Sequence, residues 1–154
     1  MNLTENQAAP DFSGPTDSAG DVSLKDFAGK NLVIFFYPRD NTSGCTTEAV
    51  GFTVKLAEFE AANTAVVGIS KDSVRSHENF RDKQALKVPL LSDKDSEVCE
   101  AFDVWRDKKL YGKTYKGIER STFLIDAQGV IRQVWRKVKV PGHVEEVLAA
   151  AQAL

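Results

Sequence analysis

The sequence of 154 residues has only two cysteines, and they do not form a Cys-x-x-Cys pair. This scarcity excludes the disulfide framework of a small secreted protein and is typical of a chain that works in a reducing compartment. No hydrophobic run approaches the length that crosses a bilayer, and the first residues have neither a basic nor an apolar leader segment. We therefore expect a cytoplasmic protein that does not associate with membranes.

The sequence also lacks a surplus of either charge, because 20 Lys and Arg residues oppose 22 Asp and Glu residues. The resulting net charge of −2 gives no electrostatic argument for nucleic acid, so the basic and apolar alternation around Arg132, Arg136, Lys137 and Lys139 is interpreted as a charged edge strand. The only histidines, His77 and His143, are too isolated for a metal site, and we expect both at solvated helix positions. We predict neither metal nor cofactor, and a small neutral substrate.

Short apolar runs predict buried strands at Leu32–Tyr37 and Ala65–Ile69. Between them, an apolar stripe at three- and four-residue steps predicts a helix from about Cys45 to Asn63. A strand, a helix and a second strand imply a right-handed crossover and a parallel pair. Further predicted elements are a helix capped by Ser73 and running to about Ala85, a strand at Val88–Leu91, a helix near Ser96–Phe102, a hairpin of Arg120–Asp126 with Val130–Val138, and a helix over His143–Ala153.

These elements predict a single α/β domain, 1–154, with a central mixed sheet covered by helices on both faces. Two segments are expected to be the least ordered, namely the residues before Pro10 and the basic stretch Arg106–Lys116. Within that stretch, four lysines and two tyrosines suggest either a docking surface for a reductant or a solvated loop: Lys108, Lys109, Lys113, Lys116, Tyr111 and Tyr115.

The cysteine at position 45 is the most informative residue, because it follows a buried strand and opens the amphipathic segment. A helix N-terminus carries unpaired N–H groups and a partial positive charge, which stabilise a thiolate. The pKa of cysteines at such places falls from about 8.5 to roughly 3.5–7.5, and the thiolate is the nucleophilic form. The sequence therefore predicts one reactive sulfur at Cys45.

The motif Pro38-x-x-x-Thr42-x-x-Cys45 resembles the active-site signature of the peroxiredoxins, which are thiol peroxidases without metal or haem. The longer runs Phe36–Thr42 and Gly44–Ala49 resemble the bacterioferritin-comigratory-protein subgroup, also called peroxiredoxin Q. Similar matches occur at Gly68–Ser73, Pro89–Asp93 and Gly117–Ile125, so the resemblance covers nearly the whole chain. It implies a thioredoxin-like fold and the reduction of hydrogen peroxide and small organic hydroperoxides.

The resemblance also implies a catalytic constellation. Thr42 would place its hydroxyl near the thiolate or the peroxide, although capping the helix is its simpler role. Pro38 would shield the sulfur or only end a strand, and Gly44 would allow close approach to backbone N–H groups. Arg120 would supply a fixed cation that stabilises both the thiolate and the leaving oxygen.

Two residues remain open at this stage. Glu48 either receives a hydrogen bond from Arg120 or only complements the helix dipole in the first turn. Cys99, between Val98 and Glu100, is either a resolving cysteine or a small buried hydrophobe, and free cysteines are more often the latter.

The positions at which relatives carry a resolving cysteine hold Val50 and Arg81 here. We therefore predict a one-cysteine enzyme whose sulfenic acid is resolved by an external thiol such as thioredoxin, glutaredoxin or glutathione, and we expect a monomer. The alternatives are a two-cysteine peroxidase with Cys99 resolving, or a redox-switched sensor or holdase. A thiol-disulfide exchanger is disfavoured because the Cys-x-x-Cys pair is missing.

Overall fold

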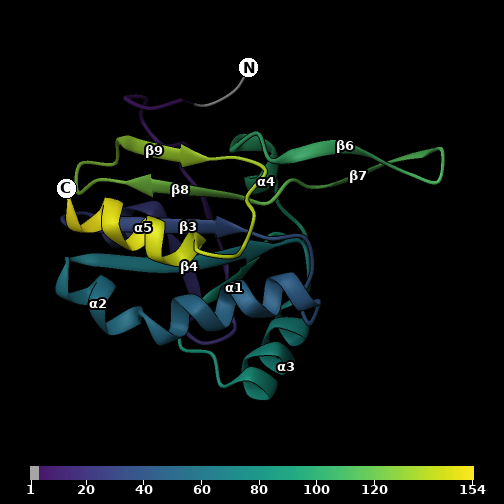
Figure 1. The fold of residues 1–154 in the computed structure, drawn as a ribbon, viewed down its shortest axis with the longest axis horizontal. Helices are drawn as coiled ribbons and strands as arrows, with labels where there is room; N and C mark the ends of the chain where they lie inside the picture. Colours follow the sequence, from purple (N-terminus) through teal and green to yellow (C-terminus); the bar gives the residue numbers. More distant parts are fainter. Residues whose placement is uncertain (1–3) are drawn as a thin grey trace.

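A computed structural model describes residues 4–154 and shows a five-stranded mixed sheet with the strand order β5-β4-β3-β8-β9 (Figure 1). The three strands β3 (Asn31–Phe36), β4 (Thr64–Ser70) and β5 (Leu90–Ser92) are parallel. The strand β8 (Ser121–Ile125) pairs antiparallel with β3, and β9 (Ile131–Trp135) pairs antiparallel with β8 and forms an edge. This order confirms the predicted parallel crossover, the hairpin and the charged edge strand.

The remaining elements connect or cover this sheet. The helices are α1 (Ser43–Val54), α2 (Leu56–Ala61), α3 (Val74–Gln84), α4 (Val98–Ala101) and α5 (His143–Gln152), and a 3₁₀ turn, η1, spans Leu24–Phe27. Two small antiparallel pairs join β1 (Ser13–Pro15) to β2 (Asp21–Ser23) and β6 (Trp105–Leu110) to β7 (Lys113–Ile118).

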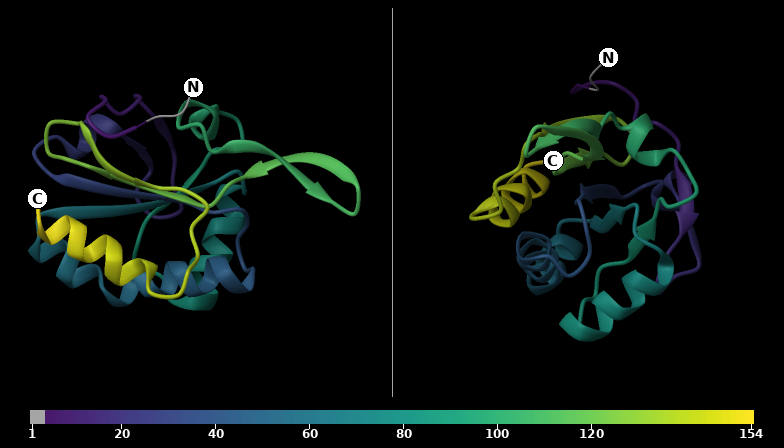
Figure 2. Two further views of the ribbon diagram at one scale, coloured as in Figure 1. Left: turned by 45° about the horizontal axis from the view of Figure 1, so that its top comes forward. Right: turned by 90° about the vertical axis from the view of Figure 1, so that its right-hand side faces the viewer.

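The sheet separates two hydrophobic clusters, because successive residues of a strand point to opposite faces. On one face, Val33 and Phe35 of β3 pack with residues of α1, α2, α3 and α5. On the other, Leu32, Ile34 and Phe36 pack with α4 and with Phe12 of the N-terminal segment. The views in Figure 2 show helices on the two sides of the sheet, as predicted for a thioredoxin-like fold.

The predicted helix over about Cys45–Asn63 is divided into α1 and α2 at Lys55. The β-branched pair Thr53 and Val54 ends α1, where side chains of this type are stiff and disfavour the helix. The apolar stripe continues through Phe59, so the sequence pattern did not reveal the interruption. The predicted cap of α3 is confirmed, since the Ser73 side chain accepts a hydrogen bond from the Ser76 amide.

The expectation that Arg106–Lys116 is among the least ordered segments is wrong, because this stretch belongs to the regular hairpin β6–β7, which extends away from the sheet (Figure 1). Its two turn residues, Tyr111 and Gly112, have φ values of 52° and 76°, as a tight hairpin turn requires. Both faces of the hairpin are largely exposed, so the strands lack the hydrophobic alternation that identifies a half-buried sheet.

The segment before Pro10 also has a place in the fold, apart from residues 1–3, which lie outside the described residues. The amide of Asn6 donates to the carbonyl of Ile131, and the amide of Ile131 donates to the carbonyl of Gln7. This segment therefore lies along the start of β9. Within residues 4–154, no helix has the length and apolar character needed to cross a membrane.

Candidate active site

Cys45 lies in the first turn of α1, directly after the loop that leaves β3. The first backbone hydrogen bond of the helix joins the Thr46 amide to the Thr42 carbonyl. The amides of Ser43, Gly44 and Cys45 therefore precede the helical ladder, and they give this end its partial positive charge. The Cys45 side chain is fully buried in the hydrophobic cluster that α1, α2, α3 and α5 form on one face of the sheet.

Arg120 approaches Cys45 from β8, the strand that runs antiparallel to β3. It directly precedes β8, whose first residue, Ser121, pairs with Phe36 at the end of β3. The guanidinium Nη2 donates to Cys45 Sγ at 3.1 Å, and Nη1 donates to Glu48 Oε1 at 2.7 Å. Burial alone would lower the pKa of Arg120, but the charges of Glu48 and Cys45 raise it overall, so the cation is secure.

Glu48 is the third member of this cluster and is fully buried one turn after Cys45. Its contact with Arg120 confirms the first of the two predicted roles. Burial raises the pKa of the Glu48 carboxyl to about 7, although Arg120 opposes this shift. Within residues 4–154, Glu48 Oε2 is a buried oxygen without a hydrogen-bond partner, and this accounts for the cost of ionising the group.

Gly44 provides the space that Arg120 occupies. A Cβ atom at this position would lie 3.3 Å from Arg120 Nη2, which is closer than an ordinary van der Waals contact. The group that lies close to Gly44 is the guanidinium, whereas the approach of a peroxide to the backbone N–H groups stays a prediction.

Thr42 and Pro38 belong to the loop before the helix. Thr42 occupies the N-cap position, but its hydroxyl makes no capping bond and instead donates to the Arg39 carbonyl at 2.9 Å. This bond closes a turn within the loop and leaves the lone pairs of the hydroxyl oxygen available as acceptors. Pro38 is exposed and follows the end of β3, as its strand-ending role predicts.

Lys108 of β6 adds a cation near this cluster. Its aliphatic stem lies over Gly117, since a Cβ there would be 3.1 Å from Lys108 Cδ. Burial lowers the pKa of Lys108, the charge of Arg120 lowers it further, and Cys45 opposes the shift. The Lys108 ammonium therefore lies close enough to Arg120 and Cys45 to interact with their charges, while Tyr111 at the tip of the hairpin is exposed.

Cys99 lies in α4 within the hydrophobic cluster on the opposite face of the sheet from Cys45. Its side chain is fully buried, and its amide donates to Asp93 Oδ2 at 2.8 Å. Burial, followed by the nearby Asp93 carboxylate, raises the pKa of the Cys99 thiol strongly. The structure thus places it where the interpretation as a buried hydrophobe expects it.

The prediction that both histidines are solvated is wrong. His77 is fully buried in α3, where its Nδ1 lies 2.7 Å from Asp40 Oδ2. His143 is buried at the start of α5, where its Nε2 lies 2.8 Å from Thr122 Oγ1. Burial lowers the pKa of His143, and the charge of Arg120 lowers it further while Glu146 opposes the shift. Each histidine is held by a residue distant in the sequence, so helix periodicity could not reveal its burial.

Asp40, Asp72 and His77 bring potential ligand atoms within 4.8 Å of one another. The Nδ1 to Oδ2 separation of 2.7 Å is a hydrogen bond, however. Two ligand atoms that share a tetrahedral metal at about 2.1 Å would be roughly 3.4 Å apart. In the described arrangement His77 therefore binds the Asp40 side chain, and the Asp72 carboxylate accepts hydrogen bonds from the Asp40 amide and the Ser70 hydroxyl.

Comparisons with known proteins agree with this geometry. The family model described as "AhpC/TSA family" matches residues 6–134. The chain is 52% identical over 148 residues to "Putative peroxiredoxin bcp" of Coxiella burnetii, covering 96% of this chain and 98% of the relative. It is 46% identical to "Peroxiredoxin Bcp" of Bacillus subtilis, covering 96% and 94% of the two chains. A cysteine-to-serine variant of Xanthomonas campestris peroxiredoxin Q superposes with a TM-score of 0.91 at 46% identity, covering 98% and 99%.

A buried thiol beside a guanidinium, at a helix start on a thioredoxin-like fold, defines a thiol-dependent peroxidase. The chain belongs to the AhpC/TSA family and, within it, to the peroxiredoxins of the Bcp or Q group.

Proposed function

We propose that Cys45 is the peroxidatic nucleophile for hydrogen peroxide and small organic hydroperoxides. Its thiolate attacks one peroxide oxygen and forms an S–O bond, while the O–O electron pair departs with the other oxygen. That oxygen takes a proton and leaves as water or alcohol, and Cys45 becomes a sulfenic acid. The observation that carries the proposal is the 3.1 Å contact between Arg120 Nη2 and Cys45 Sγ.

Each neighbour supports a part of this reaction. Arg120 stabilises the thiolate before attack and the charge on the departing oxygen during it. Glu48 holds Nη1 and so fixes the plane of the guanidinium. The Gly44 and Cys45 amides and the Thr42 hydroxyl supply further polar groups for the peroxide. A structure of an Xanthomonas campestris relative concerns "Alkyl Peroxide Reduction Activity", which supports organic hydroperoxides as substrates.

We propose that an external thiol resolves the sulfenic acid. A first external thiol attacks the oxidised Cys45 sulfur, forming a mixed disulfide and releasing water. A second external thiol then attacks the mixed disulfide, which releases the Cys45 thiol and joins the two external sulfurs in a disulfide. Thioredoxin, glutaredoxin and glutathione are the reductants of this kind that we consider. The position of Cys99 supports this route, because a Cys45–Cys99 bond would require groups from opposite faces of the sheet to meet.

A second observation favours the one-cysteine mechanism. Two structures of Xanthomonas campestris peroxiredoxin Q carry serine in place of cysteines that lie 36 positions apart. In this chain, the position 36 residues after Cys45 is occupied by Arg81. Arginine has no thiol, so this position cannot resolve the Cys45 sulfenic acid, and Arg81 instead forms an ion pair with Asp17.

The rival function is a redox-switched sensor or holdase in which oxidation of Cys45 alters a surface. A sensor requires only a reactive thiol, whereas the Arg120 and Glu48 arrangement stabilises charge on a departing oxygen. This arrangement favours a catalytic peroxidase over a sensor or holdase. We further propose a cytoplasmic, monomeric, single-domain enzyme, which localisation in cells and size-exclusion chromatography would test.

The central experiment compares the parent with Cys45→Ser, in which the alcohol is not appreciably ionised near neutral pH. We expect a folded Cys45→Ser protein to consume no peroxide, and parent-like consumption would refute the proposal. Mass spectrometry after one equivalent of peroxide should show one added oxygen on Cys45. A quantitative Cys45–Cys99 disulfide, together with loss of turnover in Cys99→Ser, would instead establish the two-cysteine alternative.

A further inference from the structure

The loop that presents Cys45 contains a buried carboxylate that the reaction does not use. Asp40 lies between the end of β3 and the start of α1, and its side chain is only 2% exposed. Ionised carboxylates are rarely buried to this degree unless several donors satisfy them. The contacts of Asp40 therefore indicate what holds this loop in place.

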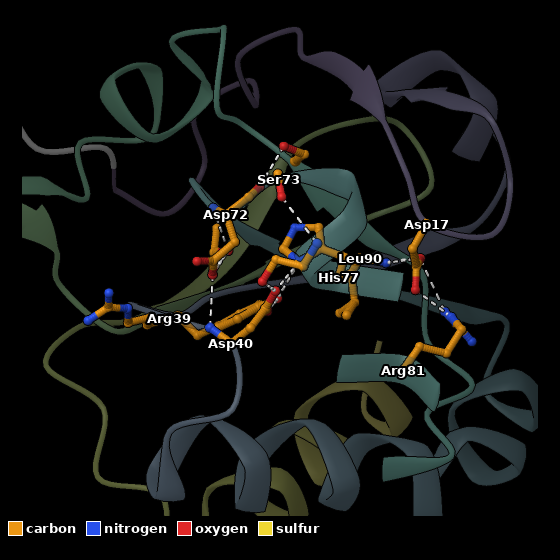
Figure 3. Close-up of polar contacts among 12 residues, drawn as sticks. Asp17, Arg39, Asp40, Asp72, Ser73, His77, Arg81 and Leu90 are labelled. Carbon is orange, nitrogen blue, oxygen red and sulfur yellow. Dashed lines mark hydrogen bonds and ion pairs between the residues drawn. The ribbon is translucent and has the colours of Figure 1, made fainter. Parts of the chain in front are cut away.

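Four residues contact Asp40, and three of them lie on α3 or directly before it. Tyr37 Oη donates to Oδ1 at 2.6 Å, Ser76 Oγ donates to Oδ2 at 2.7 Å, and His77 Nδ1 lies 2.7 Å from Oδ2. The Asp40 amide donates to Asp72 Oδ2 at 2.8 Å. Figure 3 shows Asp40 joined by dashed lines to Asp72 and toward His77.

The His77 contact requires a shared proton. His77 Nε2 lies 3.1 Å from the Leu91 carbonyl, which can only accept, so Nε2 carries a hydrogen. Nδ1 and a carboxylate oxygen approach to 2.7 Å only with a second proton between them, on either the imidazole or the carboxyl group. His77 is thereby bonded at once to β5 and to the loop.

The far end of α3 is fixed independently. Arg81, one turn after His77, forms an ion pair with Asp17, whose side chain is fully buried (Figure 3). Arg81 also donates to the carbonyls of Leu86 and Val88. The helix therefore has two anchors on the side that faces the sheet, and His77 has a fixed support.

The loop itself behaves as one unit. The Thr42 hydroxyl bond to the Arg39 carbonyl closes a turn, and Asn41 has a φ of 63°. Asp40 is the buried side chain within this turn, whereas Pro38, Arg39, Asn41 and Thr42 are exposed. Arg120 approaches the sulfur from β8, so the Sγ to Nη2 distance depends on two elements that are held separately.

We propose that Asp40 is a positioning residue for the peroxidase reaction, and that Tyr37 and His77 hold it there. The network fixes the turn Pro38–Thr42 against α3 and so keeps the Cys45 sulfur opposite Arg120. This inference rests on the proposed role of Cys45. On this proposal, α3 supports the active-site loop and holds it in place.

The test compares Asp40→Asn and Tyr37→Phe with the control Asp82→Asn, a carboxylate-to-amide change on the exposed side of α3. Tyr37→Phe removes only the hydroxyl and keeps the ring that stacks on Phe35, so it protects the test against misfolding. For each folded variant, the second-order rate constant with peroxide and the thiolate absorbance at one fixed pH are measured.

We expect Asp40→Asn to lower the rate constant at least about tenfold, because small displacements of reacting groups have effects of this order. Tyr37→Phe should lower it less, both should lower the thiolate absorbance, and Asp82→Asn should match the parent. A merely structural role would lower the melting temperature of Asp40→Asn and Tyr37→Phe without changing rate constant or absorbance, and this result would overturn the inference.

The inference and the proposed function fail in different ways. If Cys45→Ser consumes peroxide like the parent, the role of Cys45 is wrong and the network has no reaction to support. If Cys45→Ser is inactive while Asp40→Asn and Tyr37→Phe keep the parental rate constant, only the positioning role is wrong.

Discussion

Arg120 Nη2 lies 3.1 Å from Cys45 Sγ, although the two residues are 75 positions apart in the chain. The antiparallel pairing of β8 with β3 makes this contact possible, because it brings the residue before Ser121 to the end of β3. A planar guanidinium can contact the sulfur and the Glu48 carboxylate at once, through two different nitrogens. The peroxide rate constant should therefore depend on the geometry of the cation as well as on its charge.

Replacing Arg120 with lysine tests this point. An ammonium group is a point charge and cannot reproduce both directed contacts, so we expect the peroxide rate constant to fall about a hundredfold. The matched control is Arg132→Lys on the edge strand β9, which should leave the rate unchanged. Stopped-flow measurement of peroxide consumption gives the comparison, and a parental rate in Arg120→Lys would show that charge alone suffices.

Gly44→Ala should separate stability from activity. Alanine favours the helix over glycine by up to about 1 kcal/mol, so the melting temperature should stay level or rise. The added methyl group would lie 3.3 Å from Arg120 Nη2 and displace the guanidinium. We expect a several-fold loss in the peroxide rate constant without a loss of stability. A variant as active as the parent would mean that Arg120 adjusts freely.

Glu48→Gln should change how stability depends on pH. Burial raises the Glu48 pKa from 4.5 to about 7, so between these values the folded protein keeps a proton that the unfolded chain releases. The free energy of unfolding of the parent should therefore fall, relative to Glu48→Gln, as pH rises from about 4.5 to 7. The difference should reach ~3 kcal/mol and then level off.

Urea unfolding at a series of pH values measures this difference, with Glu60→Gln on the exposed surface of α2 as the control. The control should follow the parent at every pH. A constant difference between the parent and Glu48→Gln across this range would contradict the raised pKa.

Arg81→Met should destabilise the fold through Asp17. The Asp17 side chain is fully buried, and it would lose its ion-pair partner. Removing one member of a buried pair costs about 3 kcal/mol or more, because the remaining charge stays buried. Chemical unfolding should show this loss. The double variant with Asp17→Asn should recover part of it, and additive effects would argue that the two residues act independently.

Sequence patterns predicted the sheet because its strands are short apolar runs bounded by turn residues, as in Leu32–Tyr37. The reactive thiol at Cys45 followed from its place at a helix start, and the role of Arg120 followed from the resemblance to peroxiredoxins. The fold brings the two residues into contact. The role of Asp40 was not predicted, since an acidic residue in a loop is ordinarily exposed. Its burial depends on His77, 37 positions away, and neither residue alone carries a signal of the contact.

The hairpin β6–β7 shows a different limit. Its strands protrude into solvent, so they have no buried face whose alternation could be read from the sequence. The Tyr111-Gly112 turn was the available signal, since glycine readily adopts the positive φ found there. The two interpretations of the lysines along this hairpin, a docking surface for a reductant and a merely solvated segment, both stay predictions.

The two thiols occupy opposite faces of one sheet, so their chemical labelling can report where the structure opens. An alkylating reagent can reach Cys99 only when the core on that face opens, and it can reach the equally buried Cys45 only when the groups around the active site move aside. The ratio of the two labelled peptides in a single digest would compare opening of the active site with loss of the fold in the same sample. A damaged enzyme could thus be distinguished from an unfolded one without a second probe.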